Sequence, residues 1–305
     1  MICFGRRKFL QTLTTLAATG GAGEWAAGGP PVSKEKAMRL GVVVDLGTDP
    51  ESAIDRVSQF GLATCHVRAD QFSPGLALRL KHALAKNHVE ATALIDLGGG
   101  QMVWNFYGGP LTIGLVPRAT RKARIENLKQ ASDFAKQAGV PALLSHCGFI
   151  PEDPNDPLYE ETVEAIREVA KYCQGNGQTF LFETGEETPV TLLRTIMDVG
   201  MDNMGVNFDT ANLLLYGKAN PGDAIEIIGK YIRGVHAKDG FYPTNPKELG
   251  RQVPVGQGLV DFPRIIRRLK EINYRGAITI EREISGPQQD QDIREAKAYL
   301  QNLMG

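Results

Sequence analysis

Four residues that could bind a metal ion or move a proton each stand at the end of a short strand-like run. The runs are 179–182, 205–208, 232–235 and 277–280, and the residues that follow them are Glu183, Asp209, His236 and Glu281. They are separated by 26, 27 and 45 residues, and a parallel strand with its crossover helix takes about 25–30 residues. Because parallel strands end at a common edge, we expect the four side chains to lie together.

Three carboxylates that converge on one point would repel one another and take up protons unless a cation lies between them. Oxygen-rich ligands with a single nitrogen suit Mn²⁺ first, with Co²⁺, Mg²⁺ or Zn²⁺ as alternatives, and do not resemble a structural zinc site. Such a cation can chelate a carbonyl oxygen and a neighbouring hydroxyl, and so stabilise an enediolate. Glu183 and Glu281, from opposite sides of a ring, are candidate catalytic bases for its two faces.

The sequence predicts alternating strands and helices over residues 38–305, and these elements must position the four residues. Eight apolar runs alternate with about eight helical patterns, and no internal linker interrupts them after residue 37. This pattern predicts an α/β fold with one domain, a single (β/α)8 barrel at 38–305. A doubly wound open sheet is the alternative, but four chemically active ends on consecutive strands favour a ring.

Further candidates for substrate contacts follow from position along the predicted strands. His146 ends the fourth strand, and a buried structural histidine is its alternative. Lys238 could polarise a carbonyl or bind an anion, or form a surface ion pair with Asp239. Glu187 is a candidate substrate carboxylate or a cap for the helix near Thr188. Trp104 lies in a long irregular segment, 98–117, which is a candidate substrate cover or a loop packed for stability.

Composition and the first residues set outer bounds on function. The chain has 305 residues and a formal net charge of −1, which gives no electrostatic reason to expect nucleic acid or an anionic membrane. Arg6-Arg7 and the weakly apolar run 10–18 resemble a twin-arginine signal, with a basic tail as the alternative. Residues 1–37 are therefore expected to be a signal peptide and linker, and the protein to be exported to the periplasm or outside. Cys65, Cys147 and Cys173 have no metal or disulfide spacing.

Five stretches together resemble the xylose isomerase-like barrel family, in its sugar phosphate isomerase/epimerase branch. They are Phe182–Glu187, Asn207–Asn212, His236–Asp239, Gly256–Phe262 and Ile280–Glu283, and the resemblance covers residues 38–305. It implies a (β/α)8 barrel and a sugar isomerase or epimerase. Glu183, Asp209, His236 and Glu281 would hold one divalent metal, and Glu183 and Glu281 would be the acid/base pair. A small-molecule sugar substrate and a possible homodimer are also implied.

The chain departs from the ketose 3-epimerases of that family at two positions. Asn212 replaces a histidine and is a candidate substrate contact, and Lys238-Asp239 replaces a nearby arginine, which is more like inosose dehydratase-like members. A lyase or dehydratase acting on a keto-sugar, an inosose or a 3-keto-glycoside is therefore the alternative function. Five histidines and a net charge of −1 argue against a multi-zinc nucleic-acid enzyme. The paired bases argue against a sugar-binding protein without catalysis.

Overall fold

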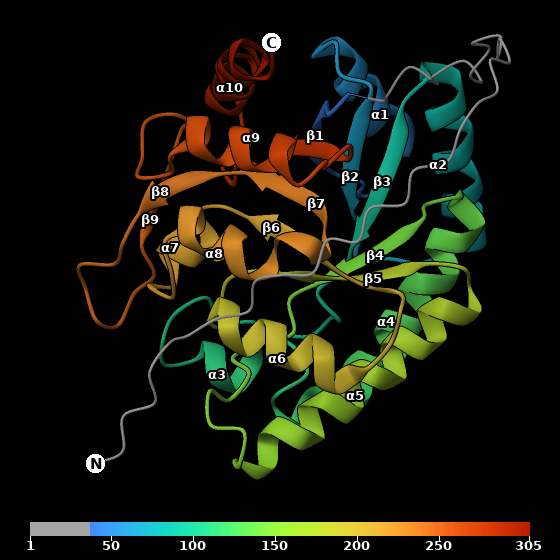
Figure 1. Ribbon diagram of the computed structural model, residues 1–305. Helices are drawn as coiled ribbons and strands as arrows, with labels where there is room; N and C mark the ends of the chain where they lie inside the picture. The colour runs from blue at the N-terminus through green and yellow to red at the C-terminus, as the bar shows by residue number, and fades with distance from the viewer. Residues whose placement is uncertain (1–36) are drawn as a thin grey trace, which may run out of the picture. The chain divides into compact units, whose positions relative to one another are not determined.

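A closed barrel of eight parallel strands forms the centre of the chain, which a computed structural model describes over residues 37–305. The barrel strands are β1 (Arg39–Asp45), β2 (Thr64–Arg68), β3 (Glu90–Ile95), β4 (Ala142–Ser145), β5 (Thr179–Glu183), β6 (Met204–Asp209), β7 (Ile232–Ala237) and β10 (Ala277–Ile280). They pair in sequence order, and β10 closes the ring against β1 (Figure 1). The barrel prediction is confirmed and the open sheet is excluded.

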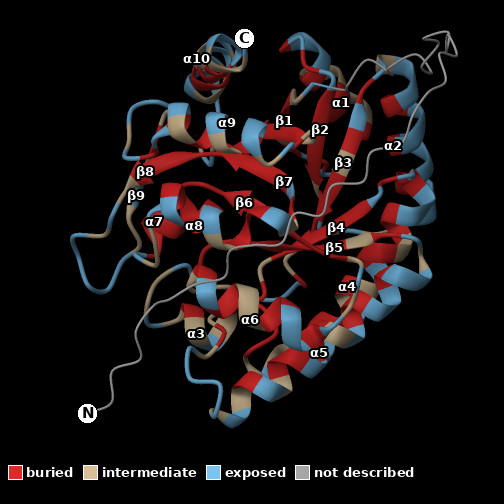
Figure 2. Cartoon of the chain, in the orientation of Figure 1, coloured by how far each residue is buried: buried red, intermediate tan, exposed pale blue. Residues whose placement is uncertain are grey.

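Helices connect the strands and cover the outside of the barrel. They are α1 (Pro50–Gln59), α2 (Pro74–Asn87), α3 (Gly109–Thr112), α4 (Arg118–Ala138), α5 (Pro157–Gly175), α6 (Pro189–Val199), α7 (Asn212–Leu215), α8 (Pro221–Ile228), the 3-10 helix η1 (Gly229–Tyr231), α9 (Phe262–Glu271) and α10 (Pro287–Met304). Their buried faces pack on the strands and their exposed faces point outward (Figure 2). None of these described helices is long and apolar enough to cross a bilayer.

Local sequence explains where several helices begin. Helices α1, α2, α5, α6 and α8 each start with a proline that follows an Asp, Ser, Thr or Asn, and the capping side chain accepts a backbone N–H of the first turn. Proline is already set for the first helical position, and the cap satisfies a donor that has no partner inside the helix. These local signals determine where the five helices begin.

Two long connecting segments contain regular structure. The segment 98–117 includes α3, and the segment 240–258 includes most of the antiparallel hairpin β8 (Asp239–Phe241) and β9 (Arg251–Val253). The carboxylate of Asp239 accepts backbone N–H groups of Gly240, Gly256, Gly258 and Val260, which ties the turn after the hairpin to β8. The twin-arginine residues and the run 10–18 lie outside the described residues, so signal and export stay predictions.

The interior of the barrel has an apolar side and a polar side. Ala93, Ile95, Ala142, Leu144 and Leu181 form a small cluster inside it, separate from the main core between strands and helices. These residues come from β3, β4 and β5. Polar side chains from β2, β6 and β7 fill the other side, including His66, Asn207 and His236. This division gives any ligand at the barrel mouth one apolar wall and one charged wall.

The close approach of the segment after α3 to the end of β4 gives a stability prediction. Gly114 has φ +70°, and a Cβ there would lie 2.1 Å from the carbonyl carbon of Cys147. Gly114→Ala should lower the free energy of unfolding by at least about 3 kcal/mol, because both the backbone and the neighbouring strand end must shift. Urea denaturation measures this change.

Gly139 is the matched control for that substitution. It also has a positive φ, +79°, but a Cβ there would meet no atom within 4 Å. Gly139→Ala should therefore cost only the left-handed backbone penalty, about 1 kcal/mol. Equal costs for the two variants would contradict the close packing at Gly114.

Candidate metal centre and active site

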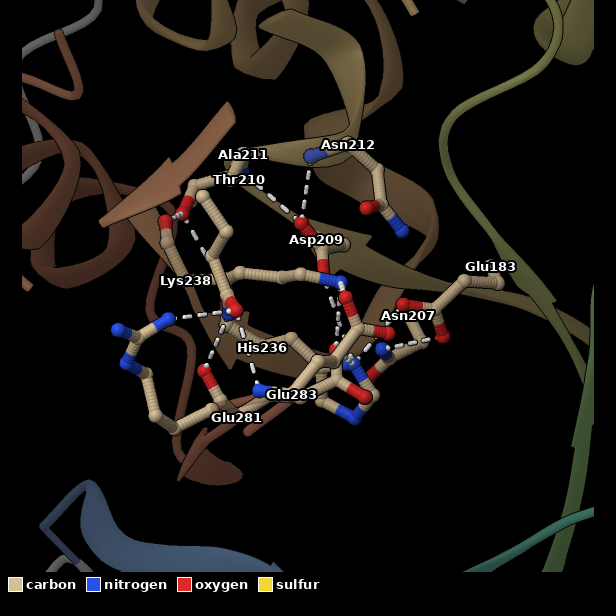
Figure 3. A network of polar contacts seen from close by, with 12 residues as sticks. Glu183, Asn207, Asp209, Thr210, Ala211, Asn212, His236, Lys238, Glu281 and Glu283 are labelled. Carbon is tan, nitrogen blue, oxygen red and sulfur yellow. Dashed lines mark hydrogen bonds and ion pairs between the residues drawn. The ribbon is translucent and has the colours of Figure 1, made fainter. Parts of the chain in front are cut away.

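The four predicted residues meet at the carboxyl edge of the barrel. Ligand atoms of Glu183, Asp209, His236 and Glu281 all lie within 4.8 Å of one another, and all four residues are buried. The strand register explains the meeting, because Asp209 pairs with His236 across β6 and β7, and Glu281 directly follows β10. Glu183 is the last residue of β5. The structure therefore brings together the residues that the spacing selected (Figure 3).

Nδ1 of His236 is the nitrogen that faces the three carboxylates. It lies 2.8 Å from Oε1 of Glu183, 3.3 Å from Oε2 of Glu281 and 3.6 Å from Oδ2 of Asp209. Its other nitrogen, Nε2, lies 2.9 Å from Nδ1 of buried His66. Burial holds the pKa of His66 well below its usual range, so His66 is neutral and can accept a hydrogen bond from Nε2–H of His236. That contact leaves Nδ1 of His236 free to act as a ligand.

Hydrogen bonds from neighbouring groups hold the carboxylates of Asp209 and Glu183 in place, and each carboxylate keeps one oxygen that a metal ion could bind. Oδ1 of Asp209 accepts the backbone N–H groups of Ala211 and Asn212, at 2.9 and 2.7 Å. Oδ2 of Asp209 accepts no hydrogen bond from the described residues, although it is fully buried. Burial raises the pKa of Asp209 to about 7, which reflects how costly this charge is without a cation. Oε2 of Glu183 accepts the side-chain amide of Asn207, at 2.9 Å.

Two cations approach the cluster from the side of Glu281. Arg68 lies 2.7 Å from Oε1 of Glu281, and Lys238 lies 3.2 Å from Oε2. Burial opposes ionisation of Glu281, but Lys238 and His236 hold its pKa well below its usual range. Nζ of Lys238 also lies 2.9 Å from Oε2 of Glu283. Figure 3 shows the Lys238 side chain reaching into the cluster. The alternative of a surface pair between Lys238 and Asp239 is wrong, because Lys238 is buried and Asp239 binds the hairpin turn.

The donor set fits one divalent cation. Three carboxylates and one imidazole nitrogen offer an oxygen-rich site. Burial opposes protonation of His236, but Glu183 and Glu281 raise its pKa well above the usual range, so a metal ion would replace a proton at Nδ1. The buried Oδ2 of Asp209, which accepts no hydrogen bond, leaves room for that positive partner. Lys238 and Arg68 offset only part of the negative charge: both contact Glu281, and Lys238 lies 3.9 Å from Oδ2 of Asp209 without a hydrogen bond to it. A cation held by Glu183, Asp209, His236 and Glu281 would satisfy the remaining lone pairs.

A cavity of about 410 Å³ lies above the cluster. Of the predicted substrate residues, His146, Asn212, Lys238 and Trp104 line it, whereas Glu187 does not. Glu187 is buried, and burial followed by repulsion from Glu186 raises its pKa well above the usual range. Its neighbour Glu186, which the sequence did not single out, contacts His146.

The sequence also missed or gave little weight to other residues at this cavity. Arg68 and Glu283 line it, and they follow or end predicted strands, so position alone could have selected them. Leu215, Tyr216 and Leu249 come from loops and a short helix, and no local pattern marks them. The cover prediction for 98–117 agrees with Trp104 at the cavity and with the bridge between Asn105 and Glu248, which joins two loops at the mouth.

Comparisons with known proteins place the fold and the site in context. The family model described as "Xylose isomerase-like TIM barrel" matches residues 54–303. A Haemophilus influenzae protein, provisionally named an L-ribulose-5-phosphate 3-epimerase, is 48% identical over 186 residues, which are 55% of this chain and 60% of that protein. The curated relatives are matched over only 41–60% of their own lengths.

Solved structures match over more of the chain. A xylose isomerase domain protein from Planctomyces limnophilus has a TM-score of 0.83 and 31% identity, covering 88% of this chain and 97% of that one. A D-psicose 3-epimerase solved in the presence of D-fructose has a TM-score of 0.66 and 19% identity, over 88% of this chain and 100% of that one. The second likeness concerns the fold alone.

Removal of one ligand charge tests the metal centre. Asp209→Asn should weaken Mn²⁺ binding by at least about 100-fold in titration calorimetry, because an amide replaces the buried carboxylate that lacks a partner. In the metal-free protein the same variant should melt at or above the temperature of the unchanged protein, since repulsion in the cluster falls. Saturating Mn²⁺ should raise the melting temperature of the unchanged protein only.

Asp96→Asn is the control for this test. Asp96 is a buried aspartate that follows β3 at the same edge of the barrel, but it accepts a hydrogen bond from Asn127 and lies outside the cluster. Its substitution should leave Mn²⁺ affinity unchanged. The same loss of affinity in both variants would argue against a metal held by the four residues.

Proposed function

The chain belongs to the xylose isomerase-like TIM barrel family, and we propose that it is a metal-dependent sugar isomerase, most specifically an epimerase. The observation that carries the proposal is the buried cluster of Glu183, Asp209, His236 and Glu281 under a cavity of sugar size. A divalent cation at these residues, with Mn²⁺ as the first choice, supplies positive charge that stabilises negative charge developing on a substrate carbonyl oxygen.

Glu183 is proposed as the base that removes the proton beside the carbonyl. Oε2 of Glu183 accepts a hydrogen bond from the neutral side-chain amide of Asn207. Among the described residues, no Lys or Arg side chain forms an ion pair with Glu183. Both oxygens of Glu281, in contrast, contact a cation. A carboxylate between two cations is the weaker base, so Glu281 suits the role of partner that returns a proton to the opposite face.

The placement of the two glutamates supports epimerisation. Glu183 ends β5 and Glu281 follows β10, and β6 and β7 separate these strands around the ring. Carboxylates from separate arcs of a barrel mouth can approach a flat enediolate from different faces. The relatives named as sugar 3-epimerases agree with this reaction.

The charges of the cavity favour a sugar without a phosphate group. Arg68 and Lys238 are the Arg and Lys residues among the described residues that line it. Arg68 pairs with Asp45 and Glu281, and Lys238 with Glu281 and Glu283. A phosphate would have to compete with these carboxylates for each cation. We therefore propose a neutral ketose or keto-sugar as the substrate class, held through Asn212, Lys238 and the apolar side of the cavity.

Solvent deuterium exchange tests the proposal. Metal-stripped and Mn²⁺-loaded protein would be incubated with neutral ketoses and their phosphorylated counterparts in D₂O, and each substrate followed by NMR. Deuterium should enter beside the carbonyl only with metal, and faster in the neutral sugar than in its phosphate. Glu183→Gln at saturating metal should slow this exchange at least about 100-fold, because the base is lost.

Glu187→Gln is the matched control, since Glu187 lies four residues from Glu183 but outside the cavity lining. Burial and repulsion from Glu186 raise its pKa and so favour its protonated form, which Gln imitates, so exchange should not change. Absence of metal-dependent exchange in every keto-sugar, with metal bound and the fold intact, would overturn proton abstraction as the function.

A further inference from the structure

Asn207 is a completely buried polar side chain one step further into the barrel than the four proposed ligands. It lies on β6 two residues before Asp209, and residues two apart on a strand point to the same face, so both side chains point into the barrel. The register pairs Asn207 with Glu183 on β5 and with Gly234 on β7. Asn207 does not line the cavity, so it can act on a substrate only through a neighbour.

The amide of Asn207 has a single hydrogen bond among the described residues. Its Nδ2 donates to Oε2 of Glu183 at 2.9 Å (Figure 3). Its Oδ1 is buried but accepts no hydrogen bond. The opposite orientation of the amide would place Oδ1 against the Glu183 carboxylate, where two acceptors repel each other. A buried acceptor without a partner costs free energy, so the contact with Glu183 sets the orientation of this amide.

Gly234 provides the space that the Asn207 side chain occupies. A Cβ atom at Gly234 would lie 2.4 Å from Oδ1 of Asn207 and 3.5 Å from Cε1 of His66. Gly234 has no positive φ, so its backbone conformation does not require a glycine. Space therefore explains the glycine, because even a methyl group would push the amide from its present place.

The two oxygens of Glu183 have different partners. Oε1 lies 2.8 Å from Nδ1 of His236, the nitrogen that faces the cluster, whereas Oε2 accepts from Asn207. A carboxylate can bind a cation through one oxygen or through both. Because the amide occupies one lone pair of Oε2, the carboxylate presents Oε1 to the cluster, and Oε2 keeps a second lone pair. That lone pair is the one left for a substrate proton.

Asn203, which directly precedes β6, shows a different use of a buried amide. Its Nδ2 donates to the main-chain carbonyl oxygens of Ala170 and Gln178, at 2.8 and 3.0 Å. Its Oδ1 is also buried without a hydrogen bond. The two asparagines therefore share an acceptor without a partner, but Asn203 joins segments of the backbone and Asn207 contacts the proposed base.

We infer that Asn207 is a positioning residue that keeps Glu183 on the metal ion through Oε1 alone, so that Oε2 remains the base. The inference rests on the proposed proton abstraction and assigns it to one oxygen. The substrate proton moves from carbon to Oε2, and the C–H electron pair stays on the substrate. An amide carries no charge, so it holds Oε2 with a smaller loss of basicity than the Lys and Arg contacts cause at Glu281.

Asn207→Leu tests the inference, because leucine keeps the branched shape of the side chain and removes the donor. Full-length Mn²⁺-loaded protein is incubated in D₂O with the neutral ketose that the unchanged protein exchanges fastest. Exchange at saturating ketose should fall at least about tenfold. KM should not change, since Asn207 does not contact the substrate.

The metal itself gives a second readout of the same variant. Titration calorimetry should show no loss of Mn²⁺ affinity in Asn207→Leu, because Oε2 of Glu183 is then free to bind the ion as well. In crystals soaked with Mn²⁺, both oxygens of Glu183 should bind the ion in the variant, and only Oε1 in the unchanged protein.

Gly234→Ala reaches the same hydrogen bond without changing Asn207. The added methyl group, 2.4 Å from the present position of Oδ1, should displace the amide, so exchange should fall while Mn²⁺ affinity is kept. Asn203→Leu is the matched control. It should lower the melting temperature, because two main-chain carbonyl groups lose a donor, and leave exchange and Mn²⁺ affinity unchanged.

Three results would overturn the inference. In the first, Asn207→Leu exchanges deuterium as fast as the unchanged protein. In the second, it loses exchange and Mn²⁺ affinity by similar factors, as a general disturbance of the metal centre would. In the third, Glu183 still binds Mn²⁺ through one oxygen in the variant crystals. If the unchanged protein binds Mn²⁺ but exchanges no substrate, the proposed function fails, and the two crystal structures still decide whether Asn207 sets the coordination of Glu183.

Discussion

The constraint on which the site depends is the convergence of buried negative charge at the mouth of a closed barrel. Asp209 and Glu183 are almost completely buried, and they meet Glu281 within a few ångströms. Burial of unpaired carboxylates costs several kcal/mol each, so the surrounding structure must supply positive charge. Lys238 and Arg68 supply part of it, through direct contacts with Glu281 and a 3.9 Å approach of Lys238 to Oδ2 of Asp209. A cation at the centre completes the balance, and the strand register that brings the ligands together is needed for both stability and chemistry.

The barrel interior has an apolar side and a polar side, so the charged groups lie unevenly around the cavity. Apolar residues of β3, β4 and β5 fill one side, and His66, Asn207 and His236 fill the other. A substrate carbonyl is drawn to the polar side, where charge can be stabilised. Glu183 at the end of β5 and His146 after β4 add polar groups to the apolar side, and Glu186 and Trp104 contact His146.

Much of this arrangement could be predicted from the sequence, because the end of a buried strand can be recognised from its residue types. A short apolar run followed by Glu183, Asp209, His236 or Glu281 marks both the strand and its chemical end. The hairpin of β8 and β9 could not be predicted in the same way. It depends on Asp239 accepting backbone N–H groups from residues up to 21 positions away, which no periodicity encodes. Glu186 and Glu187 are adjacent carboxylates, and only the loop backbone decides which one contacts His146.

Diffraction at the manganese absorption edge from crystals soaked in Mn²⁺ tests the central claim most directly. The account predicts one strong anomalous peak per chain, with oxygens of Glu183, Asp209 and Glu281 and Nδ1 of His236 each at roughly 2.0–2.3 Å. Nε2 of His236 should remain in contact with His66. A peak away from these four residues, or no peak while the carboxylates keep their present contacts, would contradict a metal centre at the barrel mouth.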